Sequence, residues 1–174
     1  RYFPVVDEEG RLLNKFITVR NGGKEFLDVV AHGNERVLRA RLSDAEFFFN
    51  EDRKLKLEDR LEKLKTVSFQ EGLGNMYDKS ERLAKLAEMV KFAINVKVDD
   101  TNLKRTALLS KTDLVAGMVV EFTELQGVMG REYAKLDGEP AEVAEGIYEH
   151  YLPRFAGDEL PKGTIGRIVG ISDK

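Results

Sequence analysis

Between Leu108 and Ala134 the sequence places charged residues in strongly apolar helical surroundings. On a period of 3.6 residues, Asp113 stacks with Leu109 on one side and with Ala116 on the other. Lys111 is flanked by apolar residues in the same way, so neither charge falls on the polar stripe of an ordinary surface helix. Because burying an unpaired charge is costly, we expect Lys111 and Asp113 each to have an ion pair, a hydrogen-bond network or a ligand.

A second helix is predicted directly downstream. Thr123 and Gln126 have the spacing of a capping box, which satisfies the first backbone N–H groups of a helix. In that helix Gly127, Gly130 and Ala134 share one face, where a neighbouring backbone could approach closely. We interpret Gln126, together with the two upstream charges, as structural buried polar side chains.

The first residues of the chain have the pattern of a β-hairpin. Tyr2 to Val6 and Leu12 to Arg20 are rich in β-formers, and Asp7 to Gly10 supplies the turn. A two-stranded hairpin is only marginally stable alone, so it should pack on helices or belong to a larger sheet. A short helix is predicted next, from Glu25 to Ala31.

From Asn34 onward the pattern is helical almost throughout. Asn34 can cap a long helix, whose continuation runs from Glu51 to Val67. Asp78, with Glu81 three residues later, marks another helix start. Further helices are predicted after Asp99 and through Lys111 and Asp113, from Ala141 to Tyr151, and after the loop Pro153 to Gly163.

Together these elements predict a mainly α-helical chain in three parts. Residues 1–32 form a β-hairpin and a short helix, interpreted as the remnant of a preceding α/β domain. Residues 33–70 form long linking helices, and residues 71–174 form a helical bundle that is truncated at its C-terminus. The sequence contains no internal repeat.

The charge balance limits the classes of partner. Of the 174 residues 34% are charged, yet the formal net charge is only −3. Because domains that bind nucleic acid are usually basic, the sequence predicts at most a local basic patch. The chain has no cysteine, which excludes disulfides and thiolate metal sites. No apolar stretch approaches the roughly 20 residues that cross a bilayer, so no membrane association is expected.

The candidate basic patch consists of Arg36, Arg39, Arg41, Arg53 and Lys54. Guanidinium groups pair well with phosphates, so these side chains could follow an RNA backbone. Alternatively, acidic residues three or four positions away along the helix pair with them. The three consecutive phenylalanines nearby could stack on bases. They cannot all point to one side of a helix, however, which favours burial.

Four motifs, in the same order along the chain, carry a resemblance to a known family. They are RYFPV from Arg1, GNERVLRARLSDAEFFFNEDR from Gly33, SKTDLVAGMVVEFTELQGVMGREYA from Ser110, and YLPRFAGDELP from Tyr151. These stretches resemble the β subunit of bacterial heterotetrameric (α2β2) glycyl-tRNA synthetase. The resemblance covers nearly the whole chain, which would be an internal fragment of that subunit.

The resemblance implies an enzyme of the cytoplasm that ligates glycine to its tRNA with ATP. In that family the separate α subunit holds ATP, Mg²⁺ and glycine, whereas the β subunit supplies tRNA recognition. The expected partners are therefore glycine tRNA, the α subunit and a second β subunit, with no cofactor in this chain. The chain contains none of the glycine-rich phosphate-binding motifs of nucleotide enzymes, so we expect it to position tRNA or to brace domains rather than to catalyse.

The resembled subunit also contains a helical domain similar to the HD phosphohydrolases, in which His and Asp side chains hold metal ions. The resemblance places the His-Asp pair at Ser110 to Leu114 and the final Asp at Asp173. Here the residue before Asp113 is a threonine, and the only histidines are His32 and His150. We therefore expect a degenerate HD-like domain without catalytic residues or a metal site. A metal-dependent phosphohydrolase and a purely structural scaffold are the alternatives.

Overall fold

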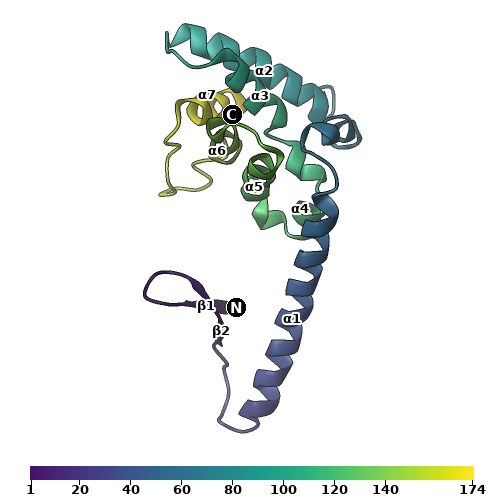
Figure 1. Cartoon of the computed structure of the whole chain (residues 1–174), viewed down its shortest axis with the longest axis vertical. Coiled ribbons are helices and arrows are strands. Elements are labelled where there is room, and N and C mark those ends of the chain that lie inside the picture. Colours follow the sequence, from purple (N-terminus) through teal and green to yellow (C-terminus); the bar gives the residue numbers. More distant parts are fainter. The chain divides into compact units, whose positions relative to one another are not determined.

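The computed structural model describes residues 1–174, which divide into two compact units, 1–42 and 43–174. Most of the chain is helical, with one two-stranded hairpin in the first unit and a shorter one in the second (Figure 1). The mainly α-helical class agrees with the prediction from the sequence. None of the helices is both long and apolar enough to span a membrane.

The first unit begins with the predicted hairpin. Strands β1 (Tyr2–Val6) and β2 (Leu12–Thr18) pair antiparallel. In the turn, Gly10 has a φ of +80°, which favours glycine, and the carboxylate of Asp7 accepts a backbone N–H at 2.8 Å. No side chain of residues 1–42 is buried.

Helix α1 runs from Leu27 to Asp52 without a break. The short helix predicted at 25–31 and the helix that Asn34 was expected to cap are therefore one element. Asn34 lies inside it, and its Nδ2 donates to the carbonyl of Val30 at 2.8 Å instead of capping. The preceding Gly33 does not interrupt the helix, since a glycine costs only about 1 kcal/mol there and no proline follows.

The helix predicted from Glu51 to Val67 is wrong beyond Asp52. Two short 3-10 helices, Glu58–Arg60 and Glu62–Thr66, take its place. The guanidinium of Arg60 donates to the backbone carbonyl of Asp52 and so satisfies an acceptor at the end of α1. The long linking helices expected over residues 33–70 are thus limited to α1.

A small hairpin that the sequence did not predict follows. Strands β3 (Ser68–Gln70) and β4 (Gly74–Asn75) pair antiparallel ahead of α2 (Met76–Ala93). The Asn75 side chain accepts from the N–H of Asp78 while the Asp78 carboxylate accepts from the N–H of Asn75, both at 3.0 Å. Helix α2 therefore begins earlier than the predicted start at Asp78, because Asn75 is the N-cap.

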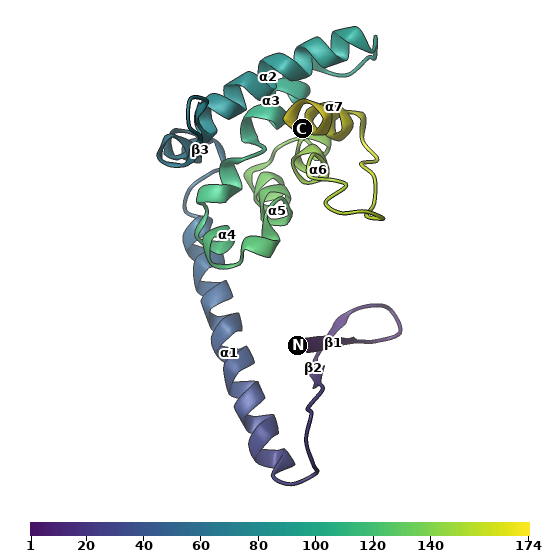
Figure 2. The same cartoon turned by 180° about the vertical axis from the view of Figure 1, so that it is seen from behind.

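The remaining long helices lie close to their predicted positions. Helix α6 lies between α5 and α7, and α2 packs against α3 and α7 (Figures 1 and 2). The start after Asp99 is confirmed, since its carboxylate accepts from the N–H of Asn102. The bounds are α3 Asp100–Leu109, α5 Val128–Asp137, α6 Ala141–Glu149 and α7 Thr164–Asp173.

The segment after α3 is not the continuous helix that the sequence predicts. Helix α3 ends at Leu109, and a 3-10 helix, Thr112–Val115, and the short helix α4, Gly117–Glu121, follow. The hydroxyls of Ser110 and Thr112 donate to carbonyls three residues back, at 2.9 and 2.7 Å. These side chains compete with the backbone donors that would continue the helix. Lys111 and Asp113 therefore lie at a break between helices.

The capping box predicted at Thr123 and Gln126 is also wrong. Residues Thr123–Leu125 form a 3-10 turn, and α5 begins after Gly127 with no capping side chain of its own. Gly127 has a φ of +78°, a conformation that favours glycine and reverses the chain. The N-terminus of α5 therefore needs an acceptor from elsewhere in the fold.

Two hydrophobic clusters form the core of the second unit. The first lies among α4, α5 and α6, with Phe48 and Phe49 packed on it, whereas Phe47 is 58% exposed. Two of the three phenylalanines are thus packed on the core and partly buried, and the third is exposed. The second cluster lies between α2, α3 and α7 and includes Leu83, Leu103 and Ile168.

Candidate functional site

The side chain of Lys111 is buried at the centre of a polar network. Its Nζ lies 2.8 Å from Asp173 Oδ2 and 2.9 Å from His150 Nε2, and 4.2 Å from the centre of the Tyr151 ring. His150 Nδ1 lies 2.6 Å from the carbonyl of Ile147. A carbonyl only accepts, so we assign the ring proton to Nδ1, and Nε2 then accepts from the ammonium.

The carboxylate of Asp173 joins two lysines. Its second oxygen lies 2.8 Å from Nζ of Lys79, which comes from α2. Burial would raise the pKa of Asp173, but Lys111 and Lys79 together hold it below its usual range. This carboxylate therefore connects the last turn of α7 to α2 and to the break after α3.

The protonation states of the network follow from its burial. Burial lowers the pKa of Lys111, although the neighbouring carboxylate of Asp173 opposes that effect. Burial also lowers the pKa of His150 to about 3, and the Lys111 charge adds to this. The imidazole is therefore neutral at pH 7, as its hydrogen bonds require.

Asp113 is fully buried, as its apolar neighbours in the sequence indicate. Its Oδ2 accepts from the N–H of Gly127 at 2.6 Å and from that of Gly130 at 3.2 Å. These are donors at the N-terminus of α5, where the helix dipole favours a negative charge. Burial raises the pKa of Asp113 to about 6, while these two N–H groups act in the opposite direction.

The glycine face of α5 does allow other parts of the chain to approach closely. The groups that lie against it are side chains, however, and not the backbone of a neighbouring helix. A Cβ at Gly130 would lie 2.8 Å from Ile147 Cγ2 and 3.0 Å from Asp113 Oδ2. A Cβ at Gly127 would lie 2.6 Å from the Tyr151 ring. Both positions therefore exclude larger residues.

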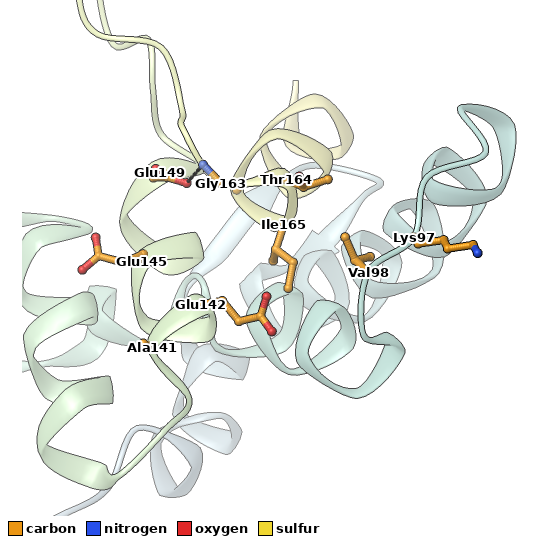
Figure 3. A pocket seen from close by; sticks show the side chains of 10 residues that line it. Lys97, Val98, Ala141, Glu142, Glu145, Glu149, Gly163, Thr164 and Ile165 are labelled. Carbon is orange, nitrogen blue, oxygen red and sulfur yellow. Dashed lines mark hydrogen bonds between the residues drawn. The ribbon is translucent and has the colours of Figure 1, made fainter.

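Two more buried carboxylates cap helices in the same way. Asp52 accepts from the N–H groups of Gly117 and Met118, both at 2.8 Å, at the start of α4. Glu149 accepts from the N–H groups of Lys162 and Gly163, at 2.9 and 2.8 Å, where α7 begins (Figure 3). Helices α4, α5 and α7 have no side-chain cap from their own N-cap residues. We call Asp52, Asp113 and Glu149 the capping carboxylates.

Sequence reasoning missed Asp52 and Glu149 as buried polar residues. Asp52 also accepts from the Tyr133 hydroxyl at 2.9 Å and lies 3.5 Å from Arg60 Nη1. The sequence did contain an indication of such residues, because no Ser, Thr, Asp or Asn directly precedes α4 or α7. The first N–H groups of a helix without its own cap need an acceptor from a distant residue.

Gln126 is half-buried and connects to the network through one hydrogen bond. Its Nε2 donates to the Tyr151 hydroxyl at 2.6 Å. Burial raises the pKa of Tyr151 above its usual range, so the phenol stays neutral. Gln126 thus holds the ring over which the Lys111 ammonium lies.

The structure does not bring the five candidate RNA-binding side chains to the buried network. Arg36, Arg39 and Arg41 are exposed residues of the first unit, while Arg53 and Lys54 belong to the second. The Arg53 guanidinium lies 5.7 Å from the centre of the Phe49 ring, and Lys54 forms an ion pair with Glu51 at 2.5 Å. For Lys54 an ion pair with an acidic residue three positions away, just past the end of α1, is therefore the observed arrangement.

The residues of the network do not fit a metal ion. No group of three or more His, Cys, Asp or Glu side chains converges anywhere in the 174 residues. His150 Nε2 and Asp173 Oδ2 both face the Lys111 ammonium, which takes the position between them. Neutral imidazole and carboxylate are metal ligands, but here a protein cation already satisfies both.

A cavity of about 480 Å³ lies between α6 and the start of α7 (Figure 3). Three carboxylates line it, from Glu142, Glu145 and Glu149, against one ammonium, from Lys97. Glu142 accepts from Asn102 Nδ2 at 2.7 Å, and Glu145 pairs with Lys135 at 3.0 Å. Its negative charge makes this cavity unsuitable for nucleotide phosphates.

The fold and the site define a mainly helical protein in which Lys111, His150 and Asp173 are engaged with one another. Residues 1–174 match the family model described as "Glycyl-tRNA synthetase beta subunit". The chain belongs to this family.

Individual relatives agree with the family match. The chain is 53% identical to the glycine–tRNA ligase beta subunit of Desulforamulus reducens and 58% identical to that of Syntrophotalea carbinolica, in each case over 100% of the chain and 25% of the relative. It is 53% identical to the one from Halothermothrix orenii, over 100% of the chain and 26% of the relative. The chain therefore spans about a quarter of the length of the relatives that it matches.

Proposed function

We propose that this chain serves glycine–tRNA ligation as a non-catalytic part of the β subunit. The reaction joins glycine to its tRNA at the expense of ATP in the cytoplasm, with the adenylate chemistry and Mg²⁺ in the α subunit of an α2β2 assembly. One observation carries the proposal beside the family match. Lys111, Asp113, His150 and Asp173, the groups best suited to chemistry, are engaged with protein partners.

In this proposal residues 71–174 are a degenerate HD-like domain that contributes rigidity. The Lys111 ammonium holds together the carboxylate of Asp173 and the imidazole of His150, which lies outside the position of the hydrolases' His-Asp pair. The capping carboxylates then fix the starts of three helices. A phosphohydrolase is disfavoured because its ligand set is incomplete and occupied.

Contact with glycine tRNA is proposed for the exposed arginines Arg36, Arg39 and Arg41, and secondarily for Arg53 and Lys54. Guanidinium groups bind phosphate oxygens in pairs, and each such contact releases counterions. The alternative is a scaffold that carries no RNA and only orders neighbouring domains.

The test is a gel-shift titration of the chain against glycine tRNA at several salt concentrations. We expect binding that weakens with salt, and a variant with alanine at positions 36, 39 and 41 should lose about one unit of salt slope for each lost contact. The matched control places alanine at the exposed positions Arg82, Lys85 and Lys104. Equal loss in both variants, or no binding at all, would support the scaffold instead.

A second test concerns the chemistry. Without the α subunit, the chain should show no glycine-dependent exchange between ATP and pyrophosphate, because it contains no phosphate-binding loop. Exchange in a preparation free of α subunit would overturn the non-catalytic role. Addition of α subunit and full-length β subunit serves as the positive control.

A further inference from the structure

The hairpin of the first unit exposes more apolar surface than a stable fold leaves in water. No residue from 1 to 42 is buried, although large apolar side chains are frequent there. A two-stranded sheet needs a third strand or a packed layer to be stable, and contiguous exposed apolar side chains mark an interface. The exposed set in the hairpin comprises Tyr2, Phe3, Val6, Leu12, Leu13 and Ile17.

The two faces of the hairpin differ. Tyr2 and Phe16 lie on one face, where their ring centres are 5.5 Å apart and the Tyr2 hydroxyl donates to Asn34 Oδ1 at 3.0 Å. Phe3 and Ile17 are paired on the opposite face, because successive side chains of a strand alternate. Their exposed fractions are 43% and 58%. The face with Phe3 and Ile17 thus lacks the ring contact and the hydrogen bond that Tyr2 makes, and Val6 and Leu12 are exposed as well, at 53% and 72%.

The two edges differ as well. Each strand of this sheet pairs on one side only. Strand β1 has five residues, contains Pro4, which lacks an N–H, and changes register after it. Proline within a sheet is typical of an edge strand. Strand β2 has seven residues and no proline, so the unpaired N–H and C=O groups of its outer edge can form more hydrogen bonds with a further strand than those of β1.

We propose that β2 and the Phe3–Ile17 face are completed by further strands of the same β-subunit polypeptide. The relatives are about four times as long as this chain, so most of their length is available as the occupant. A segment of the same polypeptide also has a high effective concentration, which suits a hairpin that cannot order itself. Strand β2 contains one basic residue, Lys15, beside the apolar Leu13 and Ile17, so this surface suits the packing of a further strand better than the binding of a phosphate backbone.

The first experiment compares backbone hydrogen exchange in this chain and in the full-length β subunit of Syntrophotalea carbinolica without its α subunit. In this chain the amides of β2 should exchange within about tenfold of unstructured rates, and in the full-length subunit at least about 100-fold more slowly. If the amides of β2 are already protected in this chain, the proposal is overturned. The hairpin is then either stable by itself or completed by a second copy of the chain, and light scattering distinguishes the two through the molar mass. Protection that appears only after α subunit is added would overturn it too.

The second experiment uses variants of the full-length subunit at the aligned positions. Ile17→Lys should raise exchange in β2 by about tenfold or more and leave α6 unchanged. Asn21→Lys adds the same charge at an exposed loop position and should change hydrogen exchange neither in β2 nor in α6. If Ile17→Lys is insoluble, Ile17→Thr replaces it with a smaller increase expected. Unchanged exchange in β2 for the soluble Ile17 variant would overturn the proposal. Neither experiment depends on tRNA binding, so the outcome is independent of the proposed function.

Discussion

The two units of the chain differ in the extent to which they bury their side chains. The second unit buries even charged groups, such as Lys111 and Asp113, and gives each of them partners. The first unit leaves Phe3 and Ile17 exposed and buries nothing. Stability therefore comes from the packed unit, and substitutions should have large effects in residues 43–174 and small effects in residues 1–42.

The largest effect is expected for Lys111→Met. Methionine keeps most of the side-chain volume but leaves Asp173 with only Lys79 and removes the donor to His150 Nε2. Loss of one partner of a buried ion pair costs about 3–5 kcal/mol. Urea unfolding followed by circular dichroism measures the change in unfolding free energy.

The control for this variant is Lys104→Met, at an exposed position of α3. It should change the unfolding free energy by less than about 0.5 kcal/mol. Similar values for the two lysines would mean that the buried ion pair contributes nothing, and the contrast between the units would then rest on apolar packing alone.

The next largest effect is expected for Asp113→Ala. The substitution leaves the N–H groups of Gly127 and Gly130 without an acceptor in a buried position. It should cost about 2–4 kcal/mol, and Asp113→Asn should cost less because the amide oxygen still accepts. Thermal melts of the two variants decide the matter. An unchanged melting temperature for the alanine variant would show that Asp113 is solvated.

A third effect is pH-dependent. The pKa of Asp113 is raised to about 6 in the folded chain, so the native state binds this proton more tightly than the unfolded state. The stabilisation is fully present below about pH 4 and is lost as the pH rises through 6, by roughly 2–3 kcal/mol. His150, with a pKa lowered to about 3, acts in the opposite direction, since its contribution is lost as the pH falls below about 6.5.

The measurement must therefore separate the contributions of Asp113 and His150 to the pH dependence of the unfolding free energy. The difference in unfolding free energy between wild type and Asp113→Asn cancels the contribution of His150. We expect wild type to lose stability relative to the asparagine variant between pH 4 and pH 7.5. A difference that stays constant over this range would mean that the pKa of Asp113 is not raised.

What the sequence predicts correctly is local. Runs of β-forming residues around the turn Asp7 to Gly10 give β1 and β2, and the Asp99 cap gives the start of α3. The burial of Lys111 and Asp113 also follows from their immediate neighbours. Residue types within ten or twenty positions determine these features.

What the sequence could not predict depends on distant partners. Lys111 meets His150 and Asp173, which lie 39 and 62 positions further along the chain. Asp52 caps α4 from 65 positions away. Such contacts also override local signals, since Thr123 and Gln126 have the spacing of a cap but α5 uses Asp113 instead. No periodic pattern within one segment encodes these choices.

The smallest effect is expected when the same side-chain change, from isoleucine to valine, is made once in each unit, so that the two losses of unfolding free energy can be compared directly. Ile168→Val removes a methylene at a fully buried position of the second cluster, and about 0.5–1.5 kcal/mol should be lost. Ile17→Val removes the same group at a position that is 58% exposed, and the change should stay below about 0.5 kcal/mol. Urea unfolding of the two variants in parallel provides the test. If Ile17→Val costs as much as Ile168→Val, the first unit packs against something within this chain, and the contrast between the two units does not hold.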